Sequence, residues 1–325
     1  MNVARQKHTA SILSNGKVLV AGGYNYNGYS NSAEVYDPAT GGWTKTGNMS
    51  TIRYLHTASV LSNGKVLVAS GVDYYSNPNS AEVYDPATGV WTKTGNMIIA
   101  RYYHTASILS NGKVLVAGGY TNDGISNSAE VYDPATGVWT KTGNMTIARY
   151  YHTASMLSNG KVLVAGGFNY SGYSNSAEVY DPATGVWTKT GNMTIARSYH
   201  TASMLSNGKV LVAGGYTNDG YSNTAEVYDP ATGVWTKTGN MTIARYLHTA
   251  SMLSNGKVLV AGGYVYSGYS NSAEFYDPAT GVWTKASNMG LGRSYHTASI
   301  LSNGKVLVAG GYEYSGYLNS TELYT

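Results

Sequence analysis

Arginine recurs once in every 48 residues of this 325-residue chain, always three positions before a histidine. Its guanidinium group is a planar fork of donors that suits carboxylate, phosphate or sulfate. Two alternatives are open. The arginines bind an anionic ligand, or each pairs with the glutamate that also recurs once per repeat, because buried charges are normally paired. The arginines are Arg5, Arg53, Arg101, Arg149, Arg197, Arg245 and Arg293, and the glutamates are Glu34, Glu82, Glu130, Glu178, Glu226, Glu274 and Glu322.

Tyrosine is the second residue type that could contact a ligand, with 31 copies against two phenylalanines. Many tyrosines lie in the segments that differ between otherwise similar repeats, and others directly follow an arginine. Tyrosine offers a large amphipathic surface at low entropic cost, although loops also vary when nothing constrains them. The predicted contact residues are Tyr26, Tyr74, Tyr170, Tyr266 and Tyr314.

The histidines favour a structural role, because one per repeat cannot converge into a metal site and a hydrogen bond between repeats explains each of them. The chain has no cysteine, which excludes disulfides and thiolate chemistry. Asn122-Asp123-Gly124 and Asn218-Asp219-Gly220 are interpreted as turns, since each offers too few ligands for calcium. Catalysis needs an asymmetric group of residues, which uniform repeats lack. We therefore expect no catalytic residue, metal or cofactor.

The segment that must position these residues is NGKVLVAGG, residues 15–23, which returns every 48 residues. Its Asn-Gly pair predicts a two-residue type I′ turn between strands at 8–13 and 17–21. In one copy Ser70 replaces the first glycine of the final pair, whereas the second glycine never changes. That second glycine is therefore expected to have the more demanding backbone geometry.

Two more strands are predicted in the first repeat, at 32–36 and 42–46, separated by a turn with Pro38 and Gly41. Four short antiparallel strands cannot bury their faces alone, so the repeats must pack face to face and close as a β-propeller. We predict one all-β domain, 1–325, of seven blades. The repeats are 1–48, 49–96, 97–144, 145–192, 193–240, 241–288 and 289–325, and the last lacks its outer strand.

With Gly22-Gly23 after the second strand, Tyr36 in the third and Trp43 in the fourth, the chain resembles the kelch-repeat family over nearly its whole length. The YDPATGxW and NGKVLVAGG segments are similar to kelch repeats of bacterial surface and secreted proteins. The resemblance implies a seven-bladed propeller, and it implies little about function. Copper oxidases with kelch-like blades need a cysteine-linked tyrosine, which this chain cannot form.

The net charge of +4 is spread over the repeats without a run of Lys and Arg, which argues against nucleic-acid binding. No apolar stretch is long enough for a membrane span, and residues 1–5 do not resemble a signal peptide. The resemblance favours an extracellular or cell-surface location.

In a four-stranded blade, the connections between the second and third strands and between consecutive blades lie at the same end. The leading hypothesis is a non-catalytic propeller that recognises a protein or peptide, including an acidic one, at that end. One alternative is a lectin-like module that stacks sugars on the tyrosines, and another is a recently amplified or engineered scaffold without a ligand. Because the last blade lacks strand d, the ring is expected to close by side-chain packing between the last and first blades. We also expect the open edge of the last blade, Asn319 to Tyr324, either to mediate self-association or to pair with a supplementary strand of the full-length protein.

Overall fold

The Asn-Gly turns organise the start of each blade. In the first, Leu13 N–H donates to Lys17 O at 2.8 Å and Gly16 N–H donates to Leu13 O at 2.9 Å. Asn15 Oδ1 accepts from Lys17 N–H at 3.1 Å. Of the three turn residues, Ser14, Asn15 and Gly16, only Gly16 has a positive φ, which is 78°. The predicted type I′ turn, which requires positive φ at both central residues, is therefore wrong. The loop is a three-residue turn with glycine in the left-handed position.

The computed structural model describes residues 1–74 and 77–324. Each blade begins with two strands, here called strand a and strand b. Strands a are β1 (Thr9–Ile12), β7 (Thr57–Val60), β11 (Thr105–Ile108), β17 (Thr153–Met156), β23 (Thr201–Met204), β29 (Thr249–Met252) and β35 (Thr297–Ile300). Strands b are β2 (Val18–Ala21), β8 (Val66–Ala69), β12 (Val114–Ala117), β18 (Val162–Ala165), β24 (Val210–Ala213), β30 (Val258–Ala261) and β36 (Val306–Ala309).

Strands c and d complete the blades. Strands c are β5 (Ala33–Asp37), β9 (Ala81–Asp85), β15 (Ala129–Asp133), β21 (Ala177–Asp181), β27 (Ala225–Asp229), β33 (Ala273–Asp277) and β39 (Thr321–Tyr324). Strands d are β6 (Gly42–Lys45), β10 (Val90–Thr94), β16 (Val138–Lys141), β22 (Val186–Lys189), β28 (Val234–Lys237) and β34 (Val282–Lys285).

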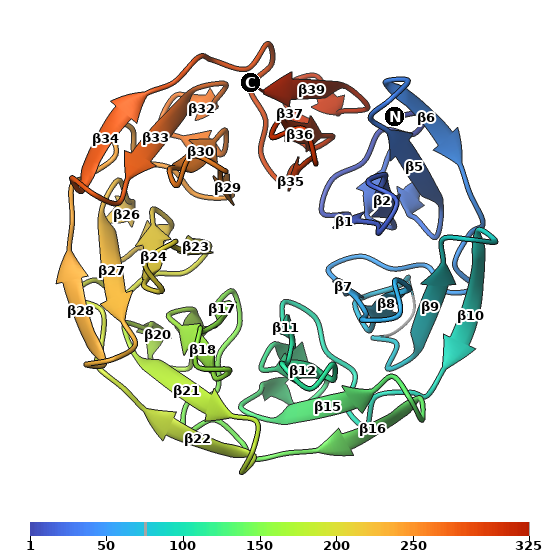
Figure 1. Ribbon diagram of the computed structural model, residues 1–325, viewed down its shortest axis with the longest axis horizontal. Helices are drawn as coiled ribbons and strands as arrows, with labels where there is room; N and C mark the ends of the chain where they lie inside the picture. The colour runs from blue at the N-terminus through green and yellow to red at the C-terminus, as the bar shows by residue number, and fades with distance from the viewer. Residues whose placement is uncertain (75–76, 325) are drawn as a thin grey trace. The chain divides into compact units, whose positions relative to one another are not determined.

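The sheets are antiparallel with the order a-b-c-d, as in β1-β2-β5-β6, and the last sheet, β35-β36-β39, has three strands (Figure 1). The fold is a seven-bladed β-propeller, as predicted. The chain divides into two compact units, Met1–Thr142 with His296–Thr325 and Gly143–Tyr295. Each unit is described by itself below, and the prediction of one domain over 1–325 stays a prediction. Across 1–74 and 77–324 there is no helix long and apolar enough to cross a membrane.

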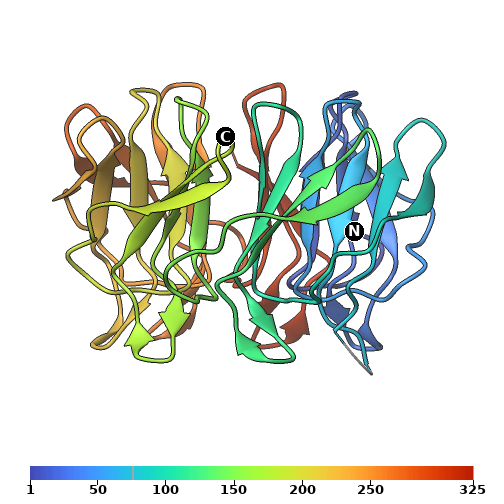
Figure 2. The ribbon, with the colours of Figure 1, turned by 90° about the horizontal axis from the view of Figure 1, so that it is seen from below.

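The connections between strands b and c, called b–c segments below, contain short hairpins that the sequence did not predict. They are β3 (Tyr24–Asn25) with β4 (Gly28–Tyr29), β13 (Tyr120–Thr121) with β14 (Gly124–Ile125), β19 (Phe168–Asn169) with β20 (Gly172–Tyr173), β25 (Tyr216–Thr217) with β26 (Gly220–Tyr221), β31 (Tyr264–Val265) with β32 (Gly268–Tyr269), and β37 (Tyr312–Glu313) with β38 (Gly316–Tyr317). In each unit they lie at the opposite end of the blades from the a–b turns (Figure 2). The hairpins therefore project the variable residues away from the sheets.

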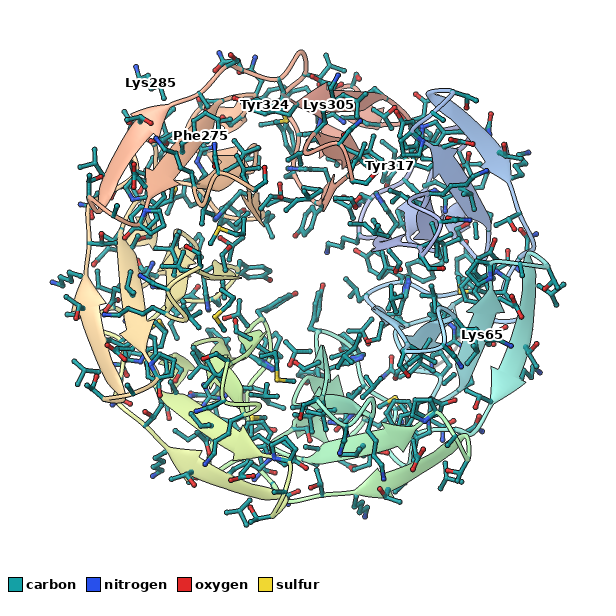
Figure 3. All side chains as sticks on the ribbon, in the orientation of Figure 1. Lys65, Phe275, Lys285, Lys305, Tyr317 and Tyr324 are labelled. Carbon is teal, nitrogen blue, oxygen red and sulfur yellow. The ribbon has the colours of Figure 1, made fainter. Side chains whose placement is uncertain are left out.

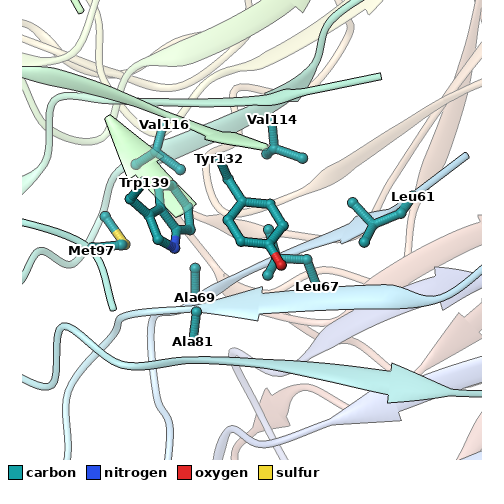
Figure 4. Close-up of a cluster of buried hydrophobic side chains, with 9 residues drawn as sticks. All are labelled: Leu61, Leu67, Ala69, Ala81, Met97, Val114, Val116, Tyr132 and Trp139. Carbon is teal, nitrogen blue, oxygen red and sulfur yellow. The ribbon is translucent and has the colours of Figure 1, made fainter. Parts of the chain in front are cut away.

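The core lies between neighbouring blades. Leu67 and Ala69 of β8 face Val114 and Val116 of β12 and the indole of Trp139, all buried (Figure 4). Strand b is covered on both faces, which explains why its sequence VLVA does not alternate between apolar and polar residues. Within each unit, inter-blade packing thus buries strand b and leaves strand d as the outer wall.

Candidate functional site

The predicted arginines are buried inside the blades. Arg5 has no exposed side-chain surface. Its Nη1 donates to the carbonyls of Gly22 and Ser32 at 2.8 and 3.0 Å, and its Nη2 donates to Ser32 Oγ and Glu34 Oε1, both at 3.0 Å. The same four acceptors recur around Arg149, with Glu178 at 3.0 Å. The structure therefore shows the arginine–glutamate pairing.

The glutamate anchors the segment that enters each blade. Glu34 Oε2 accepts from Asn2 N–H at 2.6 Å, and Oε1 accepts from Val3 N–H at 3.0 Å. Burial alone would raise the pKa of Glu34, but the hydrogen bonds from Asn2 and Arg5 hold it below its ordinary value. The pair thus connects the segment before strand a to strand c. Ligand binding by the arginines stays a prediction, and their burial favours the structural role.

The histidines connect neighbouring blades, as predicted. His8 Nε2 lies 3.0 Å from Thr297 Oγ1, and His56 Nε2 lies 2.9 Å from Thr9 Oγ1. Burial lowers the pKa of His56 to about 3, with the charge of Arg53 as a smaller cause. The imidazole is therefore neutral at physiological pH and acts as an inter-blade hydrogen-bonding group.

The five predicted tyrosines lie on the b–c segments with their rings largely in solvent. Tyr26, Tyr170, Tyr266 and Tyr314 are 68–75% exposed, and Tyr74 is 49% exposed. Every one of them therefore reaches the surface that the sequence had favoured for binding. Whether they contact a ligand stays a prediction.

Three of these tyrosines, Tyr26, Tyr74 and Tyr266, also contact the preceding blade. The hydroxyl of Tyr26 donates to Ser315 O at 3.1 Å, and its ring packs edge-on against Tyr317 at 4.8 Å. The Tyr74 hydroxyl likewise donates to a backbone carbonyl of the first blade, at 3.0 Å. Tyr266 packs on Tyr221 at 4.5 Å in the second unit. One side of these three rings is thus held by protein, while about half or more of each residue stays exposed.

The residue two positions after each arginine has a positive φ, which the sequence did not reveal. The seven residues are Lys7, Leu55, Tyr103, Tyr151, Tyr199, Leu247 and Tyr295, with φ between 50° and 58°. Side chains rarely adopt this backbone conformation, and such strain concentrates at functional positions. The only signal in the sequence was that the residues after each arginine differ between repeats.

Lys7 is the one lysine at this position. Its Nζ lies 5.1 Å from the Tyr54 ring centroid, 5.5 Å from that of Tyr103 and 3.4 Å from the Tyr103 hydroxyl. Burial lowers the pKa of Lys7 to about 8. Together with the b–c segments, the seven positive-φ residues form what we call the loop face of each blade.

The loop face carries more acidic than basic side chains. Its b–c segments contain Asp73, Asp123, Asp219 and Glu313, whereas Lys7 is its one lysine. The other thirteen lysines belong to the a–b turns and to strands d. Because the arginines are buried, an acidic partner would meet mainly charge of its own sign here. The charges therefore favour a neutral or basic partner over the acidic one considered from the sequence.

Comparison with models of known protein families identifies the family of this chain. The model described as the KLHDC2/KLHL20/DRC7 Kelch-repeats domain matches residues 1–144 and 56–243. The chain belongs to the kelch-repeat family. The model of the Attractin/LZTR1 beta-propeller matches residues 170–320. Kelch domains commonly bind proteins. Exposed tyrosines on the b–c segments of this chain are compatible with such a role.

Among solved structures, the kelch chain is similar to a fungal alcohol oxidase of the AA5 family in complex with copper. The TM-score is 0.81 at 21% sequence identity, over 99% of this chain and 74% of the oxidase. At that identity the likeness shows the fold alone. No curated protein sequence matches the chain.

Proposed function

We propose that this kelch propeller is a non-catalytic binding module that recognises a protein or peptide with its loop face. The observation that carries the proposal is the set of large tyrosine rings held on the b–c segments with most of their surface in solvent. Tyrosine is enriched among the residues that dominate the energetics of protein interfaces. The charges of the face support a neutral or basic partner.

The rings are arranged to bind at low entropic cost. Tyr26 is held by its hydroxyl and by Tyr317, and Tyr266 is held by Tyr221. A side chain that is already ordered loses little freedom on association, so more of its burial appears as affinity. Tyr26, Tyr74 and Tyr266 are thus pre-positioned aromatic contacts at the tips of their blades.

Absence of catalysis is part of the proposal. Arg149, Glu178 and their counterparts recur in the same buried network. Within residues 1–74 and 77–324, the repeated residues of the loop face supply no matching acid, base and nucleophile. A binding role requires no such asymmetry, since different tyrosines can contact different parts of one partner.

The test is a pull-down from a proteome extract, followed by Kd measurement for each captured protein. Replacing Tyr170, Tyr266 and Tyr314 by serine should weaken binding at least tenfold, or about 1.4 kcal/mol. A matched control replaces three exposed aliphatic residues outside the loop face, Ile108, Val138 and Val282, by serine. A captured partner that binds both triple variants alike, or no captured partner, would contradict the proposal.

A further inference from the structure

A groove opens beside strand d, between one blade and the next, away from the loop face. Among the described residues, three such grooves lie within single units, between the second and third blades, the fourth and fifth, and the fifth and sixth. Its volumes are about 440, 430 and 610 Å³. We call these the outer grooves. Each is in the size range of small-molecule sites.

One wall of each groove is apolar and exposed. Val90, Val186 and Val234 stand on strands d and are 53–54% exposed. Tyr132 lies at the bottom of the first groove, with its hydroxyl 2.8 Å from Thr94 Oγ1, and Pro134 lies on the side of the next blade. In the first blade Gly42 occupies the position of these valines, and so offers no such wall.

An ion pair in each groove presents an acceptor beside a donor. Lys65 Nζ lies 3.0 Å from Asp85 Oδ2, with the two side chains 44% and 29% exposed. The Ala87 N–H donates to Asp85 Oδ1 at 2.9 Å and so fixes the carboxylate. This hydrogen bond and Lys65 hold the pKa of Asp85 below its ordinary value. The pairs Lys161–Asp181 and Lys209–Asp229 repeat this geometry at 3.0 Å in the other two grooves.

This donor–acceptor pair matches two neighbouring hydroxyl groups, of which one donates to the carboxylate while the other accepts from the ammonium group. The valine wall matches the C–H face of a sugar ring. Lys93, on strand d, adds a second ammonium group to the first groove, and its counterparts do so in the others. Figure 3 labels Lys65 near β9 and β10, and it shows Lys285, the equivalent of Lys93, projecting outward from β34.

We propose that the outer grooves are binding sites for the sugar units of an acidic polysaccharide, one unit in each groove. The ammonium groups outnumber the carboxylate in every groove, which favours a sugar that itself carries a carboxylate. The aspartate distinguishes sugars from phosphate polymers, because it accepts hydrogen bonds from hydroxyl groups and a phosphodiester backbone offers it no such donor. The second unit holds two such grooves one blade apart, so a polymer that spans both gains avidity.

The experiment compares two triple variants with the same change of net charge. The first replaces Asp85, Asp181 and Asp229 in the grooves by asparagine, which can still accept the backbone hydrogen bond. The control replaces the loop-face residues Asp73, Asp123 and Asp219 by asparagine. The probe is an oligogalacturonate of about ten units, measured by calorimetry against a neutral dextran and an oligothymidylate of similar length.

Oligogalacturonate should bind the wild type, and the groove variant should bind it at least tenfold more weakly while the control keeps or improves its affinity. General charge attraction predicts the opposite for the grooves, since removing three negative charges would strengthen binding in both variants. Three results would overturn the proposal: stronger binding by the groove variant, no binding of oligogalacturonate to the wild type, or equal binding of oligothymidylate. Replacing Val90, Val186 and Val234 by threonine should also weaken binding, whereas replacing the loop-face tyrosines should not, which separates this site from the proposed function.

Discussion

At the scale of single residues, Lys7 is the main break in the repeat symmetry of the loop face. It occupies a positive-φ position that holds leucine or tyrosine in the other six repeats. Its ammonium group is half-buried against two tyrosine rings. Burial disfavours the charged form, while the ring faces favour it. The lowered pKa indicates that burial has the larger effect.

Lys7→Leu should therefore stabilise the protein at pH 7, by about 1–3 kcal/mol after the loss of the ring contacts. The folded-state pKa of about 8 lies below the ordinary value of 10.5. The folded state thus releases its proton first as the pH rises, and the destabilisation by the charge disappears between about pH 8 and 10.5. The measurement is urea unfolding from pH 7 to 10, with the exposed Lys45→Leu as the control. A gain that does not shrink as the pH rises would contradict the account.

A second residue-scale prediction separates the two roles considered for the arginines. Arg149→Ala leaves Glu178 buried without its charged partner and should cost on the order of 3 kcal/mol of unfolding free energy. The control is Lys161→Ala in the same blade, whose exposed pair with Asp181 should contribute less than about 1 kcal/mol. An Arg149→Ala protein with unchanged stability and weaker sulfate binding would instead support the ligand role.

At the scale of elements, the two glycines after strand b have different constraints. The second glycine has φ values of 93–104°, beyond the left-handed region that other residues reach. A Cβ on Gly167 would lie 2.7 Å from Tyr150 O, and one on Gly166 would lie equally close to Arg197 O, so the two positions differ in φ rather than in this contact. The first glycine has φ near 65°, and Ser70 occupies this position with φ 57°. The prediction that the second glycine has the stricter geometry is therefore confirmed.

Ser70 also shows how the first position accepts a side chain. Its Oγ donates to Arg101 O at 2.7 Å and accepts from Arg101 N–H at 2.8 Å. Gly166→Ser should consequently cost less than about 1 kcal/mol, because the same two hydrogen bonds offset the close approach. Gly167→Ser should cost more than about 2 kcal/mol through strain and contact with a carbonyl. Thermal unfolding of the two variants checks this, and equal losses would contradict it.

At the scale of the whole molecule, the first blade packs against the last blade, which has no strand d. Arg5 N–H donates to Leu318 O at 3.0 Å, and Gly311 N–H donates to Arg5 O at 2.9 Å. Backbone hydrogen bonds therefore join these two blades, which corrects the expectation that side-chain packing alone would do so. The indole of Trp43 lies 3.4 Å from Thr321 Oγ1. In the other blades the indole instead donates to the carbonyl of a glycine that follows strand d, as Trp187 does to Gly143 at 2.8 Å.

Trp43→Phe should therefore cost about 1 kcal/mol less than Trp187→Phe, because the weaker hydrogen bond is lost in the first blade. Urea unfolding of both single variants measures the difference. Tyr36→Phe and Tyr180→Phe serve as controls that keep the indoles in place. A larger loss for Trp43→Phe would show that the meeting of the first and last blades depends on the indole.

The repeat pattern was sufficient to predict the blades, the four strands of the first six and three of the last, the inter-blade histidines and the strict glycine. These features depend on local propensity and on a period that every copy repeats. The type I′ turn was predicted wrongly, because the hydrogen bond that Asn15 accepts from Lys17 N–H lets asparagine avoid the left-handed region.

Packing between residues far apart in the chain determined the rest. The burial of Arg5 depends on Gly22, Ser32 and Glu34, which three different parts of one blade supply. The position of Tyr26 depends on Ser315, 289 residues away. Repeats of nearly equal sequence contain no signal for which side chain a neighbouring blade will cover, or where two blades leave a groove open. Those properties follow from the angle and spacing at which the sheets pack, and they set both proposed binding surfaces.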